Sequence, residues 1–420
     1  MKKQTVKSAL IFVLLIAMIL NLTSCYSVKA SDLMEGISSS TVSGKTYDDT
    51  FVNSTADFSI ELFKKALTDK ENSLVSSLSV LLALSMTANG ANGETLSQMD
   101  AVLGNNIAID DLNEYMFNYV KNLPSDDKSK LSIANSIWFR DNENRLTVEK
   151  NFLQKNADYY NAAAYKCPFD DQALKDINNW VKTNTDGLID KILDKIDSDT
   201  VMYLINAIVF YAEWQNVYNK ENITDGNFTA IDDITQTAKF MRSEEGLYLD
   251  DGNATGFIKP YANGNYSFAA LLPNENISIE TYIQTLSGEG FLNTILTAEN
   301  TSVSAGLPKF SYDYTIKMND ALITLGMPDA FSPNKADFSK LGKSTNGNIY
   351  IGEVLHKTFI SVDGLGTKAG AVTKVKMTNK SSMISDVTKV VTLDRPFVYA
   401  VIDNTTNLPV FIGTVMSINE

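Results

Sequence analysis

The feature that most limits the possible folds is a long alternating segment near the C-terminus. From Thr367 to Lys380, odd-numbered positions carry Thr, Ala, Val, Met and Asn, and even-numbered positions carry Lys, Gly, Val and Thr. A period of two is that of a β-strand with two different faces. No proline occurs between Pro333 and Pro396, and proline is excluded from central strands because it cannot donate to the ladder. The segment therefore predicts a strand with neighbours on both sides; an amphipathic edge strand protected by lysines is the alternative.

Composition excludes several functional classes. The chain has 36 Lys and Arg against 50 Asp and Glu, a net charge of −14, which argues against nucleic-acid binding because phosphates require a basic face. Its one histidine is His356, and its two cysteines are Cys25 and Cys167. A histidine-rich zinc site is impossible, and any catalytic triad would depend on a single imidazole. We expect no metal site and no cofactor.

The N-terminus has the features of an export signal. Three lysines precede an apolar stretch over residues 9–20 that is short for a membrane span. The sequence of residues 22–25, Leu-Thr-Ser-Cys, resembles a bacterial lipobox. Residues 1–24 are then a lipoprotein signal peptide, and Cys25 is lipidated; an ordinary signal peptide with an incidental cysteine is the alternative. We expect residues 25–46 to form a flexible tether and the protein to be exported, either anchored at the bacterial cell surface or released.

The remainder, residues 47–420, reads as a single domain without repeats or a second change in composition. Apolar spacing predicts helices early in the chain, and β-branched and aromatic runs predict buried strands. The helical segments are 58–67, 78–87 and 176–196, and the strand segments are 131–140 and 202–212. The Asn-Gly-Asn sequence at 263–265 predicts a hairpin. Helices early and strands late indicate an α+β domain.

Eight motifs in this domain resemble those of the serpin family and occur in serpin order over about 370 residues. They are residues 72–79, 88–95, 177–181 with Gly187, 206–208 with Phe210 and Trp214, 307–310, 325–331, 356–358 and 395–397. The resemblance implies a serpin fold, with about eight or nine helices around three β-sheets and an exposed reactive-centre loop at about residues 364–390.

The resemblance also implies three groups of site residues. In serpins the hinge is the first part of the loop to enter the central sheet, called sheet A. Here the hinge positions are Gly364, Gly366, Thr367, Lys368, Ala369, Gly370, Ala371, Val372 and Thr373. The shutter, a polar network beneath sheet A, corresponds to Ser76, Ser79, Asn206 and His356. The breach, at the top of the sheet, corresponds to Trp214 and Lys309.

The implied function is suicide inhibition of serine proteases by a monomeric protein that is not an enzyme. The protease cleaves the loop, which inserts into sheet A while still acylated to the enzyme. Counting along the family pattern places the scissile bond between Lys380 and Ser381, which favours a trypsin-like target. The segment before Pro396 is longer than usual, so cleavage near Met377 or Met383 by an elastase- or chymotrypsin-like protease stays an alternative.

One departure from the family pattern concerns the breach. Gly364 stands where serpins usually carry an acidic residue, so Lys309 is expected to lack its usual ion pair unless Asp363 substitutes. Two other functions stay open at this point. One is a non-inhibitory serpin that acts as a binding protein, although small residues at Ala369 to Thr373 disfavour it. The other is a lipoprotein enzyme or solute-binding protein, disfavoured by the single histidine and by the order of the motifs.

Overall fold

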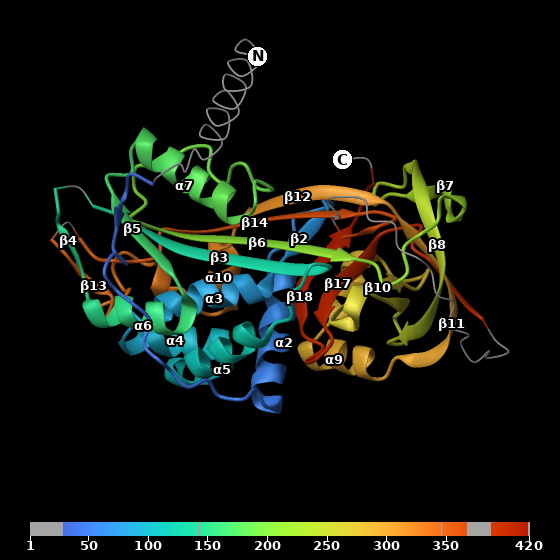
Figure 1. Cartoon of the computed structure of the whole chain (residues 1–420), viewed down its shortest axis with the longest axis horizontal. Coiled ribbons are helices and arrows are strands. Elements are labelled where there is room, and N and C mark those ends of the chain that lie inside the picture. Colours follow the sequence, from blue (N-terminus) through green and yellow to red (C-terminus); the bar gives the residue numbers. More distant parts are fainter. Residues whose placement is uncertain (1–27, 142, 346, 368–387, 419–420) are drawn as a thin grey trace, which may run out of the picture.

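The computed structural model describes residues 28–141, 143–345, 347–367 and 388–418 (Figure 1). The α-helices in this part of the chain are α2 (Asp49–Lys65), α3 (Ser77–Ala88), α4 (Gly93–Gly104), α5 (Ile109–Asn122), α6 (Lys150–Tyr160), α7 (Asp171–Asn184), α8 (Ile279–Thr285), α9 (Gly288–Leu296) and α10 (Asn319–Leu325). The strands are β1 (Ser31–Asp32), β2 (Ser73–Val75), β3 (Ser129–Arg140), β4 (Leu146–Val148), β5 (Ala163–Cys167), β6 (Met202–Glu213), β7 (Ile223–Thr229), β8 (Thr235–Asp250), β9 (Ala254–Pro260), β10 (Tyr266–Pro273), β11 (Glu299–Pro308), β12 (Phe310–Lys317), β13 (Gly342–Ser344), β14 (Glu353–Val362), β15 (Gly366–Thr367), β16 (Lys389–Thr392), β17 (Phe397–Asp403) and β18 (Pro409–Val415).

A seven-stranded sheet, here called sheet A, has the strand order β1-β5-β3-β6-β15-β14-β12, and its long strands run across the molecule in Figure 1. Helix α7 covers one face of this sheet, and α3 lies against the other, with further helices beneath it (Figure 1). Strand β6 is the apolar run expected of a central strand, and ten of its twelve residues are buried. Both faces of sheet A are therefore covered where its central strands lie.

A second sheet has nine strands, with β7 paired to β8 and the others in the order β16-β11-β8-β9-β10-β17-β18-β2. Strands β4 and β13 form a small third sheet. The Asn-Gly-Asn turn joins β9 to β10 as an antiparallel hairpin, with φ of 68° at Asn263 and 70° at Gly264. Three sheets combined with this set of helices confirm the predicted α+β class.

Helix α7 is shorter than the apolar pattern predicted. The pattern suggested helix as far as residue 196, but α7 ends at Asn184. Asp186 and Gly187 adopt positive φ values of 52° and 77°, which end the helix. The following segment returns along the helix, where Ile192 and Leu193 donate their N–H groups to the side-chain oxygen of Asn178.

The segment before α2 is packed against the domain, in place of the predicted flexible tether over the part that the structure describes. Strand β1 pairs with β5 at one edge of sheet A. The N–H groups of Lys29 and Ala30 donate to Asp176 Oδ2 on α7 at 2.8 and 2.9 Å, and the Asp176 side chain is buried. Farther along, the Ser40 N–H donates to Asp158. Residues 28–46 thus follow the surface from α7 to α2.

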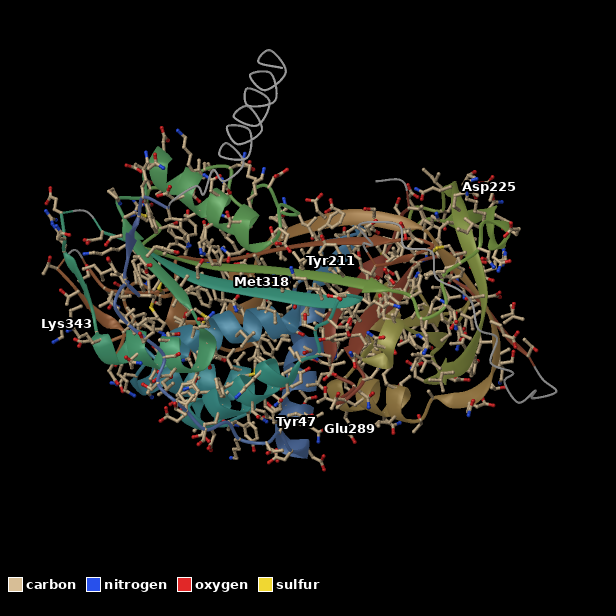
Figure 2. All side chains as sticks on the ribbon, in the orientation of Figure 1. Tyr47, Tyr211, Asp225, Glu289, Met318 and Lys343 are labelled. Carbon is tan, nitrogen blue, oxygen red and sulfur yellow. The ribbon has the colours of Figure 1, made fainter. Side chains whose placement is uncertain are left out.

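Side chains fill the space between sheet A and the helices beneath it (Figure 2). Met318, near the middle of the molecule, is fully buried, whereas Asp225, Glu289 and Lys343 lie at its periphery (Figure 2). Among the described residues, no helix combines the length and the hydropathy that crossing a bilayer requires.

Candidate functional site

The candidate site is a division in the middle of sheet A. Strands β6 and β14 run parallel and pair directly over five residues, Tyr203–Ala207 with Glu353–Lys357. Towards the far end of β6, strand β15 lies between them instead, antiparallel to both. Because β15 contains only two residues, a longer strand could occupy this place only if β6 and β14 separated along their paired part.

Strand β15 is held by a tight turn that follows β14. Val362 and Thr367 are partners across the turn, and the Asp363 N–H donates to the Gly366 carbonyl at 3.0 Å. The Asp363 carboxylate accepts from the N–H groups of Leu365 and Gly366. Asp363 therefore caps its own turn and does not replace the missing acidic partner of Lys309.

Two hinge residues are already inside the sheet. Thr367 is 2% exposed, and its hydroxyl is hydrogen-bonded to that of Tyr261. Gly366 faces the backbone of β6 so closely that an added Cβ atom would lie 2.0 Å from the Ala212 carbonyl oxygen. The resemblance implies an exposed loop over about residues 364–390, but Gly366 and Thr367 are buried as part of sheet A.

The turn is anchored by residues that follow β6. The Trp214 backbone N–H donates to the Leu365 carbonyl, and the Trp214 indole N–H donates to the Asp363 carbonyl, both at 2.8 Å. The Tyr218 backbone N–H donates to the Gly364 carbonyl at 2.9 Å. Three consecutive carbonyls of the turn are thus bonded, and Trp214, a predicted breach residue, holds the turn at the end of β6.

The four predicted shutter residues meet beneath the paired part of β6 and β14. His356 and Asn206 face each other across the two strands, with 2.6 Å between His356 Nδ1 and Asn206 Oδ1. The Asn206 amide nitrogen donates to the Ser79 hydroxyl at 2.6 Å. The Ser76 backbone N–H donates to His356 Nε2 at 3.1 Å, and the Ser76 hydroxyl caps helix α3. All four residues are fully buried.

These contacts define the protonation state of His356. Because the Ser76 N–H donates to Nε2, this nitrogen carries no proton, and Nδ1 donates to Asn206. The imidazole is neutral, and burial lowers the pKa of His356 to about 3. His356 is thus a structural member of a buried network, as the sequence analysis predicted.

Sequence reasoning missed a fifth member of the shutter. Asn135 on β3 is the register partner of Asn206, and its side-chain oxygen accepts from the Asn206 amide at 2.8 Å. The network therefore joins three neighbouring strands, β3, β6 and β14, to the start of helix α3. An asparagine within a run that is otherwise mostly apolar or small, between Leu131 and Phe139, was the signal that could have indicated it.

The breach contains a buried ion pair that the sequence analysis also missed. Lys309 lies between β11 and β12, and its side chain forms no ion pair within the described residues. Lys259 Nζ lies 2.7 Å from Glu245 Oε1, with the two side chains 2% and 6% exposed. The Lys259 ammonium also lies 4.4 Å from the ring centre of Tyr218 and 5.4 Å from that of Trp214.

Several predicted site residues lie outside the described residues. They are the hinge positions Lys368, Ala369, Gly370, Ala371, Val372 and Thr373, the scissile pair Lys380 and Ser381, the alternatives Met377 and Met383, and the lipidation site Cys25.

The fold and the position of β15 define a class of protein whose central sheet can take up a further strand from the same chain, between β6 and β14. The family model described as serpin (serine protease inhibitor) matches residues 53–418. The chain belongs to the serpin family.

Two solved structures of the thermophilic serpin tengpin are similar to this chain. The native-state structure is 57% identical, with coverage of 93% of this chain and 100% of that chain and a TM-score of 0.89. For the latent-state structure the identity is 58%, the coverage 90% and 100%, and the TM-score 0.80. Leukocyte elastase inhibitor of Xenopus laevis is 30% identical over 372 residues, 85% of this chain and 96% of that protein.

Proposed function

We propose that this serpin inhibits serine proteases by inserting its cleaved reactive-centre loop between β6 and β14. The observation that carries the proposal is the position of β15, which is buried between the two strands and leads directly into the alternating, proline-free segment. Of the two tengpin structures, the native form gives the higher TM-score with this chain, 0.89 against 0.80 for the latent form. A relative described as an elastase inhibitor also supports an inhibitory role.

The driving force for insertion is the completion of sheet A. Extension of β15 through Lys380 would add up to thirteen residues to the ladder, and each hydrogen bond contributes about 0.5–1.5 kcal/mol net. The total is on the order of 10 kcal/mol, before the cost of parting β6 from β14. A displacement of about 1 Å at a protease active site can slow its reaction, here deacylation, about 100-fold. Such a displacement costs less free energy than insertion releases, so insertion can trap the acyl-enzyme.

The target class follows from the residue at the scissile bond. Cleavage after Lys380 would place a lysine in the acidic primary pocket of a trypsin-like protease, with the small Ser381 on the other side. The segment 364–385 carries four lysines and no acidic residue, which would draw an acidic protease surface towards the loop. We assign a trypsin-like target on this basis, with Met377 and Met383 as the alternative cleavage positions.

The export features belong to the same proposal. A lipid on Cys25 would hold the inhibitor at the bacterial cell surface, where it would meet proteases outside the cell. Treatment with globomycin, which blocks removal of lipoprotein signal peptides, should leave the precursor uncleaved, and the mature N-terminal peptide should carry acyl chains by mass spectrometry. Cleavage at another position without acylation would show an ordinary secreted protein.

The test of inhibition is a covalent complex. Incubation with trypsin should give a species on denaturing gels whose mass is that of trypsin plus the inhibitor without its C-terminal fragment. Mass spectrometry of the released fragment, expected to begin at Ser381, reports the cleavage site. Clean cleavage without complex formation by trypsin, elastase and chymotrypsin would indicate a non-inhibitory serpin.

A further inference from the structure

The breach of this chain is organised around the side chain of Lys259. This residue is the last but one of β9 and is 1% exposed, and its ammonium bonds the Glu245 carboxylate on β8 at 2.7 Å. The Ser243 hydroxyl lies 2.6 Å from the same carboxylate and 3.2 Å from the Tyr218 hydroxyl. A buried ammonium is stable only with such compensation, and here the carboxylate and two aromatic faces supply it.

The two rings that contact Lys259 belong to the residues that anchor the hinge turn. Tyr218 and Trp214 lie 4.4 and 5.4 Å from the ammonium, measured to the ring centres. Their N–H groups bond the carbonyls of Asp363, Gly364 and Leu365. One side chain therefore touches both anchors of the turn that precedes β15.

A second line of contacts runs from the same strand to the hinge. Tyr261 follows Lys259 by two residues and stacks on Trp214, with ring centres 4.5 Å apart and planes 5° apart. The Tyr261 hydroxyl bonds that of Thr367 inside sheet A. The end of β9 thus reaches β15 both through the turn and directly.

We propose that the Lys259–Glu245 pair is a positioning element for loop insertion, which keeps Gly366 and Thr367 threaded between β6 and β14. This proposal rests on the proposed inhibitory function. The pair on β8 and β9 lies against Trp214 and Tyr218, so it supplies a buried electrostatic contact to the residues that hold the hinge turn. After cleavage, the new strand would extend from Gly366 and Thr367, which are already paired in sheet A. Insertion would therefore be faster than deacylation.

The test is the double variant Lys259→Met/Glu245→Leu. Both replacements are apolar and of similar size, so no charge is left buried, and such exchanges preserve folding in other proteins. The matched control is Lys239→Gln/Asp225→Asn, which removes an ion pair of the same 2.7 Å length that is exposed on β7 and β8 (Asp225 in Figure 2). Lys259→Arg, which retains the charge and the ring contacts, is the conservative variant.

Two measurements separate positioning from general stability. In hydrogen exchange, peptides covering residues 363–367 should exchange about tenfold faster in the double variant, a change of about 1.4 kcal/mol in opening, while peptides covering 203–207 and the unfolding midpoint stay unchanged. With trypsin, more inhibitor should be cleaved per complex formed. Lys259→Arg and the exposed control should behave like the wild type.

Unchanged exchange at residues 363–367 in the double variant would overturn the proposal. An equal loss of protection in all peptides would also overturn it, because the pair would then stabilise the whole fold and not the hinge. The exchange measurement needs no protease. If the wild-type protein formed no covalent complex, the inhibitory function would fail, while the effect of the pair on the hinge would still be measured.

Discussion

Asn206 on β6 and His356 on β14 are hydrogen-bonded partners at the place where these two strands must separate for a new strand to enter. The distance between Oδ1 and Nδ1 is 2.6 Å, and neither residue is exposed. Insertion of the loop must break this contact. The pair therefore contributes to the stability of the uncleaved state and to the barrier that insertion has to cross.

Substitution of Asn206 tests this role. Asn206→Ala removes one partner from each of His356, Ser79 and Asn135, and unsatisfied buried groups cost about 1–3 kcal/mol. We expect a lower unfolding midpoint in calorimetry and faster loss of inhibitory activity on warming. Asn227→Ala, at an exposed strand position, is the control and should change neither. An unchanged midpoint in Asn206→Ala would mean that the network adds no stability.

The neutral state of His356 predicts a dependence of stability on pH. Burial lowers the pKa of His356 to about 3, whereas an unfolded histidine has a pKa of about 6.5. Below pH 6.5 the unfolded chain binds the extra proton, so the free energy of unfolding falls as the pH drops from about 6.5 towards 3, by on the order of 5 kcal/mol in all.

The measurement is chemical denaturation of the wild type and His356→Gln between pH 4 and pH 8. Other groups titrate in this range, including Asp100, whose pKa is raised to about 6 chiefly by burial, so the difference between the two proteins isolates the histidine. That difference should shrink as the pH falls. Parallel curves would contradict a neutral buried imidazole.

The contact of Gly366 with the backbone of β6 predicts an effect of adding one methyl group. In Gly366→Ala the new Cβ atom would lie 2.0 Å from the Ala212 carbonyl oxygen, so β15 must leave its place. Slower insertion should raise the number of inhibitor molecules consumed per trypsin molecule trapped. Gly364→Ala is the matched control, because its Cβ atom comes closest to the end of the Ile223 side chain, at 3.0 Å, and meets Tyr218 at the ordinary contact distances of 3.6 and 3.9 Å. Equal stoichiometries for both variants would show that this contact does not matter.

Cleavage of the loop should stabilise the protein. Extension of β15 through the sheet contributes on the order of 10 kcal/mol, and for a domain of this size we expect a rise in the unfolding midpoint on the order of 10 °C. Calorimetry of the intact and nicked forms measures it. Equal midpoints would show that the cleaved loop stays outside sheet A.

The proposed scissile bond is tested at Lys380. Lys380→Ala should abolish rapid inhibition of trypsin and leave the free energy of unfolding within about 0.5 kcal/mol of the wild type, as is usual for surface substitutions. Lys376→Ala removes a neighbouring lysine of the same segment as a control and should inhibit trypsin normally. Retained trypsin inhibition in Lys380→Ala, together with faster inhibition of elastase, would move the site to one of the methionines.

Much of the fold could be predicted because its signals are local or belong to contiguous motifs. The apolar run of β6 indicated a strand buried on both faces, and the serpin-like motifs around Ser76, Asn206 and His356 identified residues that the structure brings together. The alternation that starts at Thr367 indicated a central strand, and Thr367 itself lies between β6 and β14 as part of β15.

The parts that escaped prediction depend on pairing between strands. Glu245 and Lys259 are fourteen residues apart and appear as ordinary surface charges until the β8–β9 pairing buries them together. The segment 28–46 has the polar composition of a tether, yet a few apolar side chains, among them Leu33 and Ile37, pack against the core. Composition averages over such residues, whereas packing depends on them individually.

The pairing of β1 with β5 also determines how a lipid anchor would orient the domain. Only two residues separate Cys25 from Val28, the first described residue, so an extended chain spans about 10 Å between them. By strand register, β1 lies near the Met202 end of β6, whereas Thr367 lies beside Ala212, ten residues or about 30 Å along the strand. A bilayer would then adjoin the β1 and α7 end of the molecule. The reactive-centre loop would start at the opposite end of β6, away from the lipid headgroups and accessible to a protease outside the cell.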